Sequence, residues 1–130
     1  MKKFYIRCTG CGELYMLGYC MDGGTLKLKY LASLLEWLRD HADCSFCSYS
    51  DTPQPELFEF VVGSEDVDVS PHVCASRVFI GDVLYTPIDG TMRKVVVTKL
   101  DKDSPCLFYC TIVGTGEKVK ISDTNLYREV

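Results

Sequence analysis

One stretch in the first third of the chain spaces its apolar residues as an α-helix does. Four leucines recur at i, i+3, i+7 and i+10, which places them on one helical face. These leucines are Leu28, Leu31, Leu35 and Leu38. Thr25 follows a glycine-rich turn and can cap a helix that runs to about His41. The helix is firmly predicted only from Leu31, because residues 26–30 also alternate between apolar residues and lysines, as in a strand.

Strand-like runs account for much of the rest of the chain. Residues 3–7 and 13–17 flank a pair of cysteines, and residues 57–62 form another apolar run. After residue 77 the chain reads as all-β, because short runs rich in β-branched and aromatic residues alternate with turn signals. These runs are residues 78–80, 83–88, 94–100, 107–113 and 118–121. Five short strands with tight turns over about 50 residues predict a small barrel.

The pattern divides the 130 residues into three parts. Residues 1–50 hold the predicted helix and two cysteine pairs, and residues 78–130 hold the predicted barrel. Residues 51–77, which begin with a proline-rich stretch, are predicted to be a linker with one strand and an acidic loop. Modules this small bury little apolar surface, so at least one of them is expected to need a metal or a similar covalent support.

The eight cysteines carry the strongest chemical signal. Four of them form two C-x-x-C pairs, Cys8 with Cys11 and Cys44 with Cys47. Two thiolates separated by two residues fit on one tight turn, and two such turns complete the tetrahedron that zinc prefers. The N-terminal apolar stretch is too short for a secretory leader, which favours metal ligation over disulfides. We therefore predict a structural zinc site on these four cysteines, with iron as the alternative metal.

His41 offers a different fourth ligand. It lies three residues before Cys44, so His41-x-x-Cys44 can supply the second pair and leave Cys47 free. A four-thiolate zinc site carries a charge of about −2 and a Cys₃His site about −1, so the two sites need different numbers of hydrogen-bond donors around them. Both ligand sets fill all four positions. Because a catalytic zinc keeps one position open, a structural role is expected.

The first cysteine pair resembles the knuckles of zinc-ribbon and rubredoxin-like proteins. The resemblance lies in Cys8-x-x-Cys11-Gly12 followed by Tyr15. The second pair departs from it, because Ser45 stands where a proline is usual and Ser48 where a glycine is usual. The resemblance implies metal binding over about the first third of the chain. With iron in place of zinc, it implies a one-electron carrier.

The C-terminal part resembles SH3-like and Tudor-like barrels. The residues that carry this resemblance are 78–85, with a Gly-Asp turn leading into an apolar strand, and 95–100. The expected fold class is therefore α+β, with an N-terminal zinc knuckle and one helix packed against a five-stranded SH3-like barrel. Such barrels are mostly binding platforms, so the resemblance points to recognition.

A second apolar stripe lies beside the leucine face of the predicted helix. It consists of Tyr30, Leu34 and Trp37. A small knuckle covers only one helical stripe, so the second stripe is expected to pack on the C-terminal part or on a protein partner. Exposed Trp and Tyr side chains are typical of contact sites between proteins.

Charge and composition narrow the function further. The net charge is −4 and no segment is a basic patch, which argues against binding through nucleic-acid phosphates. No apolar run approaches the roughly 20 residues that a membrane span needs. No catalytic Ser/His/Asp or Cys/His set is recognisable. We therefore expect a cytoplasmic, non-enzymatic zinc-stabilised binding or adaptor protein with a protein partner; the alternatives are the iron electron carrier and a nucleic-acid-binding zinc ribbon.

Overall fold

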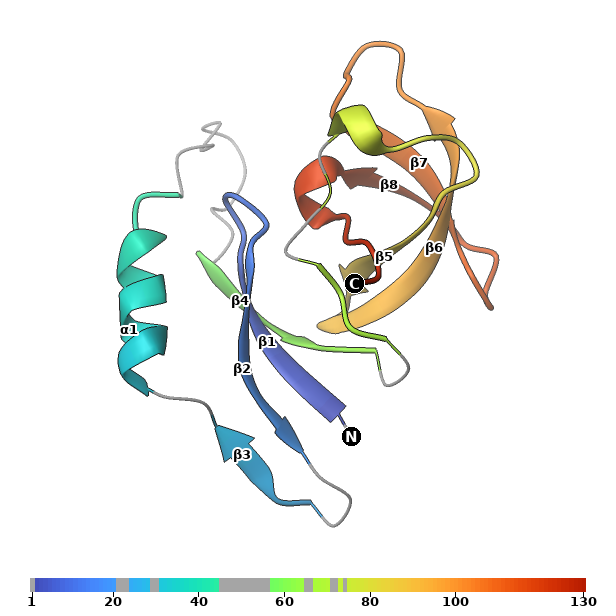
Figure 1. The fold of residues 1–130 in the computed structure, drawn as a ribbon. Coiled ribbons are helices and arrows are strands. Elements are labelled where there is room, and N and C mark those ends of the chain that lie inside the picture. Colours follow the sequence, from blue (N-terminus) through green and yellow to red (C-terminus); the bar gives the residue numbers. More distant parts are fainter. Residues whose placement is uncertain are drawn as a thin grey trace.

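The computed structural model describes residues 2–20, 24–28, 31–44, 57–64, 67–70, 73 and 75–130. Over these residues the protein is mostly β with one helix (Figure 1). The strands are β1 (Lys2–Cys8), β2 (Leu14–Cys20), β3 (Leu26–Leu28), β4 (Phe58–Val62), β5 (Val83–Ile88), β6 (Thr91–Leu100), β7 (Leu107–Ile112) and β8 (Lys118–Ser122). The helix is α1 (Leu31–Asp40), and short 3-10 turns cover Ala75–Arg77 and Asp123–Asn125. Among the described residues, no helix combines the length and the apolar content that crossing a membrane requires.

The N-terminal strands form an antiparallel group around β1, which pairs with β2 on one side and with β4 on the other. β3 pairs with the far edge of β2. The expectation that Thr25 caps the helix is therefore wrong, because residues 26–28 form a strand and the helix begins at Leu31. The alternation of lysines with leucines there follows the two-residue period of a strand, and pairing with β2 decides the ambiguity.

The C-terminal strands follow one another as antiparallel hairpins from β5 to β8. The β5–β6 turn places Asp89 and Gly90 at φ +52° and +76°. An Asp-Gly pair with positive φ at both residues matches the twist of a tight hairpin. The two groups of strands join where Val62 of β4 pairs in parallel with Thr91 of β6. One open mixed sheet therefore runs in the order β3-β2-β1-β4-β6-β7-β8, with β5 pairing β6 to the side.

The prediction of a closed five-stranded barrel is wrong. Residues 78–80 do not form a strand but lead into a turn, in which the Asp82 N–H donates to the Phe79 carbonyl at 3.1 Å and the Gly81 N–H to the Val97 carbonyl at 2.8 Å. Over the described residues β8 pairs only with β7, and the free side of β5 makes only an isolated bridge between Tyr85 and Tyr127. The strands of the C-terminal half do match the predicted runs closely from residue 83 onward.

The N-terminal strands separate two layers (Figure 1). The helix lies against one face of β1, β2 and β4, and the C-terminal strands lie against the other. On that second face Tyr5 and Val61 form a core with Tyr85, Met92 and Tyr127. A separate apolar core lies within the C-terminal strands.

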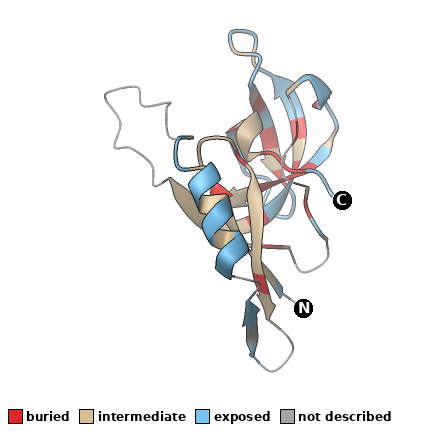
Figure 2. Ribbon diagram, turned by 60° about the vertical axis from the view of Figure 1, so that its left-hand side comes forward, coloured by how far each residue is buried: buried red, intermediate tan, exposed pale blue. Residues whose placement is uncertain are grey.

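The helix itself buries no residue fully (Figure 2). Trp37 packs on the rings of Tyr15 and Phe58, with ring centres 5.7 and 5.6 Å apart. Leu31 and Leu35 are 66% and 61% exposed. The leucine face that the spacing predicts is therefore turned largely outward, because the bulky ring of Trp37 meets the aromatic side chains of the sheet.

Candidate metal centre

Four potential metal ligands meet at one end of the N-terminal sheet. They are Cys8, Cys11, His41 and Cys44, and their ligand atoms all lie within 4.8 Å of one another. The Nδ1 atom of His41 is 3.3 Å from the Cys11 sulfur and 3.7 Å from the Cys44 sulfur. Ligands around a tetrahedral zinc, with bonds of about 2.0 to 2.3 Å, are roughly 3.5–3.8 Å apart. The group has the donors and the spacing to hold one metal ion.

The hairpin turn between β1 and β2 supplies the first two ligands. Cys8 ends β1, and its N–H donates to the Glu13 carbonyl at 2.9 Å. The Gly12 N–H donates to the Cys8 carbonyl at 2.8 Å, with Gly12 at φ +82°. A residue with a side chain rarely adopts this φ, so glycine after the second cysteine lets the turn close around both thiols.

The end of α1 supplies the other two ligands. The His41 N–H donates to the Trp37 carbonyl at 3.2 Å, which continues the helical pattern past Asp40. The Cys44 N–H then donates to the His41 carbonyl at 3.1 Å, so His41 and Cys44 share one turn. His41 lies four residues after Trp37, which places both on the helical face that meets the sheet.

The two turns meet at Gly10. A Cβ atom at this position would lie 1.8 Å from the Cys44 carbonyl oxygen. No side chain fits at that distance, so the backbone of the first turn reaches the second turn only because residue 10 is a glycine. Thr9 anchors the same turn to the start of β4, since its N–H and its hydroxyl both donate to the Leu57 carbonyl at 3.0 Å.

The ring of His41 is oriented by its neighbours. Its Nε2 atom lies 2.9 Å from a Glu13 carboxylate oxygen, and the Trp37 ring lies over the imidazole with centres 4.3 Å apart. A carboxylate at Nε2 favours the tautomer with the proton on that nitrogen. The lone pair of Nδ1 is then directed at the sulfurs, which is the carboxylate–histidine–metal arrangement of known metal sites.

A metal ion that binds this group has to displace thiol protons. Burial raises the pKa of Cys11 to about 12, and the neighbouring Cys8 thiol adds to the effect. Burial also raises the pKa of Cys44. The metal-free cluster therefore keeps these protons at neutral pH, and a metal ion must release them as it binds.

The structure brings three of the four predicted cysteine ligands together and adds His41. Cys47 lies outside the described residues, so the four-thiolate set stays a prediction. Tyr30, of the predicted partner stripe, also lies outside them. The other two stripe residues, Leu34 and Trp37, are half-buried on the side of α1 that faces the sheet.

Sequence reasoning missed the supporting residues of this site. Glu13 is the glutamate nearest in sequence to a ligand, but nothing in the pattern pairs it with a histidine 28 residues away. Gly10 reads as an ordinary glycine of a C-x-x-C turn. Both acquire their roles from the meeting of the two turns.

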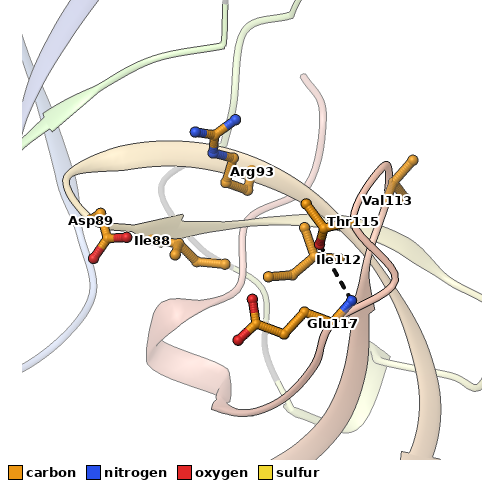
Figure 3. Close-up of a pocket in the computed structure, with 7 residues that line it drawn as sticks. All are labelled: Ile88, Asp89, Arg93, Ile112, Val113, Thr115 and Glu117. Carbon is orange, nitrogen blue, oxygen red and sulfur yellow. Dashed lines mark hydrogen bonds between the residues drawn. The ribbon is translucent and has the colours of Figure 1, made fainter.

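A small pocket lies elsewhere, at the turns that end the β5–β6 and β7–β8 hairpins (Figure 3). Its volume is about 230 Å³. The residues that line it are Ile88, Asp89, Arg93, Ile112, Val113, Thr115 and Glu117. The guanidinium of Arg93 points away from the carboxylates of Asp89 and Glu117, so the polar groups do not converge on one ligand atom. The Cys/His group is the better candidate site.

The donor atoms of the Cys/His group face one another. The three sulfurs and the His41 imidazole lie within 4.8 Å of one another, and the Glu13 carboxylate contacts the ring nitrogen of His41 that faces away from the sulfurs. Searches of known protein families, curated proteins and solved structures find nothing that matches this chain.

Proposed function

We propose that this protein is a zinc-stabilised, non-enzymatic binding protein that acts through contacts with another protein. The observation that supports it most is the group of Cys8, Cys11, His41 and Cys44 within 4.8 Å of one another. Four strong ligands fill a tetrahedral zinc and leave no position for a substrate or a reactive water. A metal of this kind supplies folding energy, because its ligands are gathered only in the folded chain.

The donor set favours zinc over iron. Cys₃His is a common set for structural zinc, whereas a rubredoxin-like iron site uses four thiolates. In this proposal His41 is the fourth ligand and Cys47 is free. The orientation of Nδ1 toward the sulfurs and the Glu13 contact at Nε2 support that choice.

A row of exposed apolar residues on β3, α1 and β4 supports the binding role. Leu28, Leu31 and Leu35 are 56%, 66% and 61% exposed, and Phe60 is 53% exposed. Isolated exposed leucines are ordinary, but several on neighbouring elements, here Leu28 of β3 with Leu31 and Leu35 of α1, are typical of a protein contact surface. We place the proposed contact on this row, since Trp37 is engaged with Tyr15 and Phe58.

Metal analysis tests the zinc centre. We expect one zinc per chain, and a cobalt-substituted protein with the absorption of a tetrahedral site with three thiolates. His41→Ala should weaken zinc binding at least tenfold, while Cys47→Ser should leave it within about twofold. The reverse pattern would establish the four-cysteine site, and a red protein holding iron would overturn the zinc proposal.

Crosslinking tests the binding role. A photoreactive amino acid at Leu35 should crosslink to a discrete protein in the native cells, and the same group at the exposed Lys102 should not. Equal products from both positions, or none from Leu35, would contradict a contact surface on the leucine row.

A further inference from the structure

The C-terminal segment packs directly on the cysteine turn. Tyr127 is completely buried, and its hydroxyl donates to the carbonyl of Gly12, the residue after Cys11. This hydrogen bond joins positions 115 residues apart in the sequence. A buried hydroxyl that loses its acceptor destabilises the folded state, so the bond matters to both segments that it joins.

A second contact between the two segments is made by backbone alone. A Cβ atom on Gly12 would lie 2.2 Å from the Thr124 carbonyl oxygen. The cysteine turn and the 3-10 turn Asp123–Asn125 therefore touch without any intervening side chain. Gly12 makes both contacts, and its N–H is also the group that closes the turn onto Cys8.

The backbone of Tyr127 also bonds to β5. Its N–H donates to the Tyr85 carbonyl at 2.8 Å, and the Tyr85 N–H donates to the Tyr127 carbonyl at 2.7 Å. Arg128, the next residue, is bound to the segment around Ser70, because the Ser70 N–H donates to the Arg128 carbonyl at 2.7 Å. One tyrosine thus connects the metal centre, the C-terminal segment and the edge of β5.

Two charged side chains, Arg7 and Glu59, lie close enough to act on the Tyr127 hydroxyl. Arg7 is buried beside it, with Nε and one Nη 3.1 and 3.0 Å from the Glu59 carboxylate. Burial raises the pKa of Tyr127 above its ordinary range, although the positive charge of Arg7 partly opposes this. The hydroxyl therefore stays protonated and acts as a donor to Gly12 throughout the physiological pH range.

We propose that metal binding at Cys8, Cys11, His41 and Cys44 controls the docking of the C-terminal segment, residues 124–130, through the Tyr127–Gly12 contact. This inference rests on the proposed metal centre and adds a regulatory consequence to it. With metal bound, the cysteine turn holds the Gly12 carbonyl where Tyr127 reaches it. Without metal the turn is free to change shape, the buried hydroxyl loses the Gly12 carbonyl and keeps only its longer contact with the Thr124 carbonyl at 3.4 Å, and the segment detaches from β5.

The coupling must act in both directions. If metal favours the docked segment, then the docked segment favours metal binding by the same factor. Weakening the Tyr127 contact should therefore lower metal affinity, although Tyr127 is not a ligand. If Tyr127 only filled the core, its replacement would lower folding stability without lowering metal affinity.

Hydrogen exchange on the full chain tests the proposal directly. We compare the zinc-loaded protein with protein treated with a chelator, following the amides of Tyr85 and Tyr127 by mass spectrometry. Removal of zinc should speed their exchange at least about tenfold, while the amides of Val95 and Val97 in β6 change less than about twofold.

The variant Tyr127→Phe tests the contact itself, because it removes the hydroxyl and keeps the ring. It should lower zinc affinity about fivefold or more and abolish most of the zinc effect on the Tyr85 amide. Tyr109→Phe, at a partly exposed ring on β7, is the matched control and should leave both quantities unchanged.

Three results would overturn the coupling. Zinc binding with unchanged exchange at Tyr85 and Tyr127 would refute it and leave the metal centre intact. Equal acceleration in β6 would show that zinc supports the whole fold and not this segment. Failure to bind zinc at all would refute the proposed metal centre and the coupling together. The wild-type exchange experiment decides these cases even if Tyr127→Phe does not fold.

Discussion

At the scale of single residues, a glycine and a glutamate shape the candidate metal centre. Ligands of the right type are of use only if two turns bring them within bonding distance of one ion. Gly10 permits the approach of the first turn to Cys44, and Glu13 fixes the direction of His41. These residues contribute no ligand atom, yet the geometry depends on them.

Gly10→Ala should therefore damage metal binding while leaving every ligand in place. The added Cβ would force the two turns apart, and we expect zinc affinity to fall about tenfold or more in a chelator competition assay. Gly114→Ala is the control. It lies at φ +100° with open space around it, so it should cost some stability and leave zinc affinity unchanged. Equal affinities for both variants would contradict the close approach.

A buried thiol outside the metal centre should make the protein sensitive to alkali. Burial raises the pKa of Cys110 from 9.0 to about 11. The folded state then keeps a proton that the unfolded chain releases, so stability is retained below pH 9 and falls as the pH rises from about 9 to about 11.

Denaturant melts across this pH range measure the loss. Cys110→Ala should give a shallower decline above pH 9, whereas Cys106→Ala, at an exposed position, should not. Tyr5 and Tyr127, whose pKa values burial also raises, add to the decline above pH 10 and prevent it from vanishing. An unchanged slope in Cys110→Ala would assign the alkaline loss to the tyrosines and to the thiols of Cys11 and Cys44.

At the scale of elements, the orientation of α1 connects the fold to the site. The same rotation of the helix that packs Trp37 on Tyr15 and Phe58 brings His41 to the sulfurs. It also turns Leu31 and Leu35 outward. The spacing of leucines correctly predicts a helix. It does not identify the side of the helix that faces the sheet, because the aromatic rings of the sheet pack on Trp37 and not on the leucines.

Trp37→Ala should consequently weaken both the helix packing and the metal centre. The ring is half-buried, so we expect a loss of about 2 kcal/mol of unfolding free energy in urea melts, with weaker zinc binding as His41 loses its cover. Leu35→Ala is the matched control on the same helix and should stay within about 0.5 kcal/mol of wild type. A larger effect of Leu35→Ala would mean that the leucine row is covered in the folded protein.

At the scale of the whole molecule, one metal ion is expected to support a chain with a modest core. The helix buries no residue, and the N-terminal strands share their second face with the C-terminal strands. A ligand that binds only the folded state adds stability according to its concentration relative to its dissociation constant.

Removal of zinc by a chelator should lower the free energy of unfolding by about 2.7 kcal/mol, relative to protein in free zinc at about 100 times its dissociation constant. Thermal melts with increasing zinc would show a midpoint that rises with metal concentration. The double variant Cys8→Ser, Cys11→Ser should show no such rise. A zinc-independent midpoint in the wild type would contradict a structural role for the metal.

The sequence by itself determined the chemistry of the site and most of the strands. Paired cysteines on tight turns identify the ligands of the first turn, and local turn signals define the hairpins from residue 83 onward, because both depend on neighbours in the chain. Only the tertiary structure decided that His41 joins the cluster, that the leucine row faces outward and that the sheet stays open. Each of these depends on contacts between distant segments, such as Trp37 with Phe58 and Val62 with Thr91, and no local pattern encodes which of several compatible surfaces will meet.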